Sequence, residues 1–252
     1  MNTKMKVLSL ALIGAFGYVG SAAAGTCPAG PTVAEGGAWT SKAVLPPSTS
    51  SVTIATPGLD ASACRMNASL GPTITAQALV RDDTPTAEPR YRFQFLVDTS
   101  TLGDFSASDN VVVFQGLAAT TANGISRALR VSLVAGPAGA KRVRFQVACD
   151  TGPTFLCAQS FGTDLLDGVN RIEGDLVVGA AGSLRAWVNA AAGTTEPAVD
   201  VTISSGDSSP WGGVESAQLG LVAPSAAYKN NHATEVAGFD AFDSRRQTYI
   251  GS

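Results

Sequence analysis

Alternation of apolar and polar residues dominates the middle of the chain and predicts β-strands. Apolar side chains occupy every second position in three runs, Tyr91 to Val97, Leu129 to Leu133 and Val143 to Val147. Such a pattern places one face of a strand in a core and the other toward water. Further apolar runs predict strands over residues 111–114, 170–178, 184–189, 199–203, 217–222 and 236–249.

Turn signals separate these runs. Gly136-Pro137-Ala138-Gly139 and the segment 179–182 each predict a hairpin turn, and residues 204–213 predict a longer polar loop with Pro210 and Trp211. No segment repeats apolar residues with the 3.6-residue period of an amphipathic helix. Many strands joined by Gly-rich turns predict an all-β sandwich or barrel.

The N-terminus has the pattern of a secretory signal peptide. Lys4 and Lys6 precede an apolar stretch from Val7 to Val19, and Ala22-Ala23-Ala24 follows. The apolar stretch is too short for a permanent membrane helix. We therefore expect a signal peptide at 1–24, a Gly/Pro/Ser-rich segment at 25–58 with one short strand near 52–54, and a single domain at 59–252. The mature protein is expected to be secreted or periplasmic, with no membrane span.

Charge argues against one class of partner. The formal net charge is −3, and loss of Lys4 and Lys6 with the signal peptide leaves 15 basic residues against 20 acidic ones, or −5. Nucleic-acid binding needs a basic stripe, so no nucleic-acid partner is expected.

The four cysteines are expected to form disulfides, because export exposes them to an oxidising compartment. Three pairings are possible. Proximity in sequence favours Cys149 with Cys157, which leaves Cys27 with Cys64. A zinc site is disfavoured because the chain has no Cys-x-x-Cys pair and its only histidine, His232, lies far from the cysteines. Lipid attachment at Cys27 is disfavoured by Thr26 before it.

Four motifs in the second half of the chain occur in a familiar order. They are Asn170-Arg171-Ile172-Glu173, Gly182-Ser183-Leu184-Arg185-Ala186-Trp187-Val188-Asn189, Ser216-Ala217-Gln218-Leu219-Gly220 and Phe239-Asp240-Ala241-Phe242-Asp243-Ser244-Arg245-Arg246. Their order resembles that of bacterial concanavalin A-like (laminin-G-like) jelly rolls. The resemblance implies two stacked antiparallel sheets, one with a concave face that often holds a saccharide. The fold hosts lectins, glycosidases, lyases and adhesion modules, so it implies no single activity.

Catalytic motifs of this superfamily are incomplete. Its glycosidases carry three carboxylates as E-x-D-x-x-E; Glu173 and Asp175 supply two, but Val178 stands in the third place. Its polysaccharide lyases use a histidine or tyrosine base, and His232 falls in a polar loop where a solvated role is expected. No G-x-S-x-G elbow is present. These gaps favour a non-catalytic module.

Binding residues are expected on outward strand faces. Alternation turns Arg185 and Trp187 away from Leu184, Ala186 and Val188. Trp187 then either offers a platform for a sugar ring or packs under a loop or in the second face of the core. Arg142 and Arg144 are expected to point outward from another strand, where guanidinium groups bind carboxylated sugars. Arg92, Arg130, Arg171, Gln94 and Gln146 would join them if the strands share one sheet. Asp240 matches a position that holds a structural calcium ion in related jelly rolls, with backbone carbonyls as further ligands.

The sequence thus predicts a secreted, non-catalytic jelly-roll module that binds a polysaccharide or cell-surface glycan through Trp187, Arg185, Arg142 and Arg144. One alternative is a structural or adhesion module that contacts proteins. The other is a glycan-cleaving enzyme, either a glycosidase or a polysaccharide lyase, whose site the motifs do not reveal.

Overall fold

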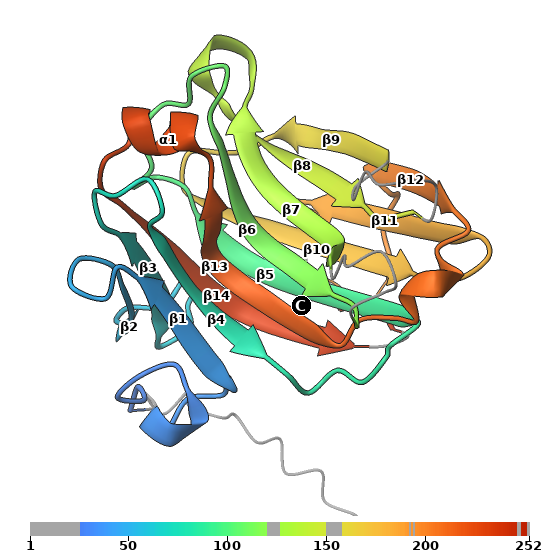
Figure 1. The fold of residues 1–252 in the computed structure, drawn as a ribbon, viewed down its shortest axis with the longest axis horizontal. Helices are drawn as coiled ribbons and strands as arrows, with labels where there is room; N and C mark the ends of the chain where they lie inside the picture. Colours follow the sequence, from blue (N-terminus) through green and yellow to red (C-terminus); the bar gives the residue numbers. More distant parts are fainter. Residues whose placement is uncertain are drawn as a thin grey trace, which may run out of the picture.

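The computed structural model describes residues 26–119, 127–149, 158–191, 193, 195–245 and 248–250. The predicted signal peptide lies outside them. The chain forms two seven-stranded antiparallel sheets that face each other (Figure 1). The front sheet has the order β1 (Ser41–Leu45), β4 (Gln77–Asp82), β13 (Ser216–Pro224), β6 (Asn110–Leu117), β7 (Arg127–Ala135), β8 (Lys141–Val147) and β9 (Ala158–Asp164). The back sheet has the order β12 (Val201–Gly206), β11 (Gly182–Val188), β10 (Val169–Val177), β5 (Arg90–Asp98), β14 (Glu235–Arg245), β3 (Arg65–Leu70) and β2 (Ser51–Ala55).

This architecture confirms the predicted all-β, two-sheet jelly-roll sandwich. Helical structure in the described residues amounts to η1 (Val33–Glu35), η2 (Pro137–Gly139), η3 (Ser209–Trp211) and the single-turn helix α1 (Ala226–Asn231). Both predicted hairpins are present, because β7 pairs with β8 and β10 pairs with β11 in antiparallel register. Within the described residues, none of the helices has the length and apolar character needed to cross a bilayer.

The inward side chains of the alternating strands form the core, which fills the space between the two sheets. Phe114 of β6 stacks on Phe93 of β5 with ring centroids 4.3 Å apart, and on Phe95 with centroids 5.7 Å apart. All three rings are fully buried. Aromatic pairs of this kind contribute beyond the area they bury. The apolar residues at every second position of β5, β7 and β8 are therefore the residues that build this core.

Four strands escaped prediction: β1, β3, β4 and β9. Strand β9 is an edge strand with mainly polar and small residues, so its pattern carries little apolar signal. Strands β1 and β2 lie in the Gly/Pro/Ser-rich segment, and β2 covers the short strand expected near 52–54. They pair with β4 and β3, so this segment contributes one edge strand to each sheet.

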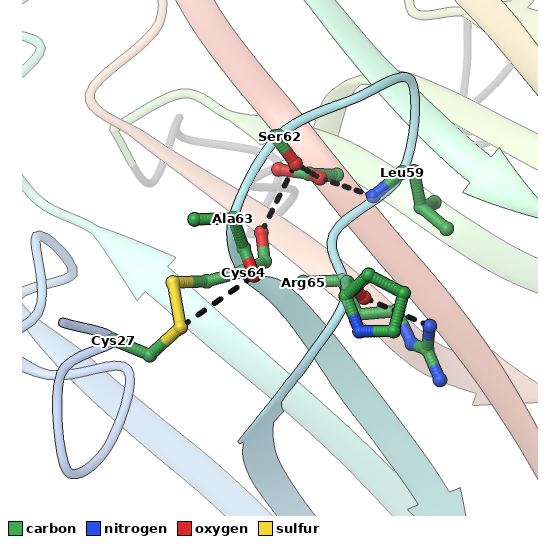
Figure 2. Close-up of a disulfide and its surroundings, with 8 residues drawn as sticks. Cys27, Leu59, Ser62, Ala63, Cys64 and Arg65 are labelled. Carbon is green, nitrogen blue, oxygen red and sulfur yellow. Dashed lines mark hydrogen bonds between the residues drawn. A yellow bond between two sulfur atoms is a disulfide. The ribbon is translucent and has the colours of Figure 1, made fainter. Parts of the chain in front are cut away.

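A disulfide fastens the N-terminal segment to the back sheet. Figure 2 shows the bond between Cys27 and Cys64, which directly precedes β3. This confirms the predicted Cys27–Cys64 pair. Cys149 is also disulfide-bonded, whereas Cys157 lies outside the described residues.

Candidate functional site

A row of polar side chains crosses the outer face of the front sheet. Register pairs Gln159 of β9 with Gln146 of β8, Gln146 with Arg130 of β7, and Arg130 with Gln115 of β6. The row continues through Gln218 of β13 to Arg81 of β4. Cross-strand partners point to the same side of a sheet. Their neighbours along each strand, such as Val131, Phe145 and Phe114, pack in the core, so these six residues (the polar row) face outward.

A second set of residues lies next to the polar row on the same face. Ser132 pairs with Arg144, and Arg144 pairs with Phe161 of β9. Phe161 is 46 % exposed. Arg130, Arg144 and an exposed aromatic ring therefore share one surface, a combination suited to sugars that carry carboxylates.

Buried polar atoms without hydrogen-bond partners concentrate on this face. Native structures leave few such atoms, because each costs about 1–3 kcal/mol. Within the described part of the chain, six of them belong to outward residues of β6, β7 and β8: Asn110 Oδ1, Gln115 Oε1, Arg130 Nε, Ser132 Oγ, Arg144 Nε and Gln146 Oε1. A polar ligand lying across these strands would supply the missing partners.

The charge on this face is also uncompensated. Arg142 pairs with Asp164 at 2.9 Å, but Arg130 and Arg144 form no ion pair with any described residue. Burial, together with the positive charges of Arg127 and Arg144, lowers the pKa of Arg130 to about 10. Burial likewise lowers the pKa of Arg144. A carboxylate bound here would compensate both the desolvation of the two guanidinium groups and their mutual repulsion.

The structure divides the four sugar-binding residues expected from sequence between the two sheets. Arg142 and Arg144 lie on the front sheet, whereas Arg185 and Trp187 lie on the back sheet. Trp187 does point away from the core, as predicted. Its ring is only 1 % exposed, however, because it packs against Tyr249 and Arg92 and donates its Nε1–H to Pro197 O. The expected open platform is absent at this position.

Glu173 and Asp175 share the outer face of the back sheet, but they are buried instead of solvated. Arg92 Nε donates to Glu173 at 2.9 Å, while Arg90 and Arg185 donate to Asp175 at 2.8 and 2.6 Å. The backbone N–H of Ile250 caps Glu173 at 3.1 Å. These carboxylates are held by arginines, and the third carboxylate of the glycosidase motif is replaced by Val178.

His232 is buried at the end of α1, contrary to the solvated loop position expected from sequence. Its Nδ1 lies 2.8 Å from Glu235 and its Nε2 lies 3.0 Å from Asp109. The ring also stacks on Tyr228 with centroids 4.5 Å apart. Both nitrogens are occupied by carboxylates, so this imidazole is a packing element and not a free base.

Asp240 lies at the rim of a pocket of about 390 Å³ at the open edge of the sandwich. Its carboxylate accepts hydrogen bonds from Leu59 N–H (2.7 Å), from the Ser62 hydroxyl and from Ala241 N–H (2.7 Å); Figure 2 shows Leu59 and Ser62 in the turn above the disulfide. These neighbours present donors where calcium would need oxygen ligands. The contacts do not fit a calcium site as arranged, and the calcium expectation stays a prediction.

Five residues of this face were missed at the sequence level: Arg81, Gln115, Gln159, Gln218 and Phe161. Gln115 and Gln218 interrupt otherwise apolar strands directly beside a Gly or Leu-Gly pair, and Gln115 Nε2 donates to Gln218 Oε1. A lone amide within an apolar strand was the available signal. The sequence carries no such signal for Phe161, because the residues of β9 do not alternate between apolar and polar.

Comparisons with known proteins identify the fold. No protein-family model and no curated protein matches the chain. Among solved structures, the chain is similar to an endo-β-1,4-glucuronan lyase from the fungus Trichoderma reesei, at 10 % identity and a TM-score of 0.59, with 83 % of this chain and 91 % of that chain covered. It is also similar to the alginate lyase Aly36B, at 11 % identity, a TM-score of 0.60 and coverage of 88 % and 93 %. A third is the cellulose-induced protein Cip1, at 14 % identity, a TM-score of 0.53 and coverage of 84 % and 95 %.

These neighbours correct the functional prediction. The sequence favoured a non-catalytic carbohydrate-binding module, whereas the same sandwich carries polysaccharide cleavage in the glucuronan and alginate lyases. The glycan-cleaving alternative is therefore better supported than the main prediction. The jelly-roll part of the predicted resemblance is confirmed.

Proposed function

We propose that the protein is a glycan-cleaving enzyme of the lyase type that acts on an acidic polysaccharide along the polar row of the front sheet. The observation that carries this proposal is the pair Arg130 and Arg144, two half-buried guanidinium groups with no described acidic partner, among unpaired polar atoms on one face. The neighbours named glucuronan lyase and alginate lyase support it, because both polymers are built from uronic acids.

A lyase needs positively charged groups such as this arginine pair to neutralise the substrate carboxylate. A lyase removes the proton next to the carboxylate of a uronic acid, forms a C=C double bond and breaks the C–O bond to the neighbouring sugar, whose oxygen takes a proton. The step is slow until the carboxylate charge is neutralised, because the intermediate places a second negative charge on it. Arg130 and Arg144 would bind that carboxylate and stabilise the developing charge.

The group that accepts the proton is not assigned. Among the described residues, the outward positions of this face carry no imidazole, phenol or primary amine. His232 is bound by two carboxylates, Tyr91 and Tyr228 are buried in the core, and Lys229 donates to three backbone carbonyls. The proposal therefore concerns the substrate class and the charge-neutralising residues.

The test is an assay of the mature protein from Gly25 on alginate, polyglucuronate and polygalacturonate, with a neutral glucan for comparison. Formation of the double bond is followed by ultraviolet absorbance, and new reducing ends are counted separately. We expect both signals from at least one polyuronate and neither from the neutral glucan.

Variants connect that activity to the face. Arg144→Gln is expected to lower kcat/KM at least tenfold, since hydrogen bonds to charged groups contribute about 1.5–3 kcal/mol. The matched control is Arg245→Gln, which removes one exposed, ion-paired arginine from the back sheet and should leave activity unchanged. Reducing ends without ultraviolet absorbance would indicate a hydrolase, and no product from any polymer would overturn the proposal.

A further inference from the structure

The polar row runs across the strands of the front sheet, and this direction constrains how a polymer can lie on it. It contains one outward polar side chain from each of six consecutive strands, β9, β8, β7, β6, β13 and β4, in direct register. Adjacent strands are about 4.8 Å apart, so the row is about 24 Å long. The separation of about 4.8 Å between adjacent strands is close to the length that one sugar adds to an extended glycan chain.

Outward positions along a single strand offer no polar row of this length. Strand β8 presents three polar side chains, Arg142, Arg144 and Gln146, of which Arg142 is already paired with Asp164. On β4, the outward residues are Gln77, Leu79 and Arg81, and Leu79 is buried in a small apolar cluster with Val112 of β6 and Val222 of β13. That cluster separates the polar row from the polar residues at the other end of these strands. A glycan lying parallel to β4, β6 or β13 would place hydroxyl groups on apolar side chains.

Charge along the row is graded. Strand β7 contributes Arg130 to the row, and Arg144 of β8 lies beside the row on the same face. Neither arginine has an ion-pair partner among the described residues, whereas Arg81 at one end of the row is already paired with Asp83 at 2.5 Å. The other positions, Gln115, Gln146, Gln159 and Gln218, are neutral amides that can both donate to and accept from sugar hydroxyls. Carboxylate recognition is therefore concentrated at β7 and β8.

We propose that the glycan crosses the front sheet perpendicular to its strands, with about one sugar per strand along the polar row and a carboxylated sugar over Arg130 and Arg144. This inference rests on the proposed function for the choice of an acidic glycan. It adds the orientation of the chain, the number of sugars recognised and the position of the carboxylate.

The test measures binding of a ladder of polyuronate oligomers of increasing length by calorimetry, alongside cleavage. Affinity is expected to increase with each added sugar and to level off near six sugars, one for each strand of the row. Gln159→Ala at one end and Arg81→Gln at the other should each weaken binding of the long oligomers about fivefold, the effect of one hydrogen bond. Neither variant should affect oligomers that are too short to span the row.

Gln77→Ala is the matched control, because Gln77 faces outward on the same strand as Arg81 but lies four residues, or about 13 Å, away from the row. It should leave the binding of every oligomer unchanged. Equal affinity for short and long oligomers, or a loss in Gln77→Ala without a loss in Gln159→Ala, would overturn the proposed orientation. Binding with the expected length dependence but without any cleavage product would overturn the proposed function and leave the orientation standing.

Discussion

The guanidinium group of Arg92 lies over the indole ring of Trp187, with Cζ 4.8 Å from the ring centroid, and both side chains are 1 % exposed. Arg92 also donates to Glu173 at 2.9 Å and to Glu196 at 2.8 Å. A cation is thus enclosed between carboxylates and an aromatic ring on the outer face of the back sheet. The cluster is arranged to hold the back sheet and its covering segments together.

Removing that cation is predicted to destabilise the protein strongly. Arg92→Ala leaves the buried Glu173 without its arginine, and breaking a buried pair in this way costs about 3–5 kcal/mol. The free energy of unfolding in urea measures the effect. Arg245→Ala, which breaks the exposed pair with Asp243, should cost no more than about 1 kcal/mol. Equal losses in the two variants would show that the Arg92 cluster contributes no more than a surface pair.

Acid is predicted to weaken this cluster through Asp175. Burial raises the pKa of Asp175, but hydrogen bonds from Arg90 and Arg185 outweigh burial and hold the pKa below its ordinary value. The stabilisation is therefore complete above the unfolded-state pKa of about 3.9 and is lost as the pH falls through the lower folded-state pKa. Urea unfolding at a series of pH values should show wild type more stable than Asp175→Asn at pH 6, with the difference shrinking below pH 4.

The control for that series is Asp167→Asn, which removes one exposed carboxylate outside the cluster. Its stability should follow that of the wild type across the whole range. A difference between wild type and Asp175→Asn that does not change with pH would contradict the assignment of this acid sensitivity to Asp175.

Gly174 is predicted to be intolerant of any side chain. A Cβ atom at this position would lie 2.4 Å from the ring of Phe93, inside the stacked aromatic core. Gly174→Ala should cost about 1–3 kcal/mol by overpacking. Gly179→Ala, at a position with nothing within 4 Å of the added carbon, should change the melting temperature little. Comparable melting temperatures for the two variants would show that Phe93 moves aside freely.

His232 is predicted to serve stability and not catalysis. His232→Gln removes one of the two imidazole contacts with Asp109 and Glu235, and the loss of a hydrogen bond to a buried charged group costs about 1–3 kcal/mol. Urea unfolding should show that loss, while kcat on a polyuronate stays within about twofold of wild type at a temperature where the variant is folded. A large fall in kcat without a loss of stability would identify His232 as a catalytic residue.

The sequence predicts those parts of the fold that depend on local pattern. Strands β5, β7 and β8 alternate cleanly because each turns one apolar face to the core between the sheets, although the outer face of β5 is also buried. The hairpin turns between β7 and β8 and between β10 and β11 carry Gly and Pro signals. The neighbours of each strand were beyond prediction, because pairings such as β13 with β6 join residues about one hundred positions apart. For this reason the expected arginine face divides into two faces on opposite sheets.

Burial by distant segments limited the prediction of site residues in the same way. Alternation gave the correct direction for Trp187, but its exposure depends on Pro197 and Tyr249, which no pattern within β11 reveals. Arg144 and Gln146 were found because their own strand alternates. The polar row itself is a property of register across six strands, and register is set only when the whole sheet is assembled.

The order of strands in the back sheet has a consequence for how the chain reaches its final state. Strand β14, which is the last strand in the described sequence, lies between β5 and β3 instead of at an edge. Without residues 235–245, the back sheet is divided into a four-stranded part that ends at β5 and a two-stranded part that ends at β3. The edges of β5 and β3 are then unpaired, and unpaired edges promote association with other chains. Completion of the back sheet therefore requires β14, and a chain that ends before Glu235 is expected to aggregate instead of folding into a smaller domain.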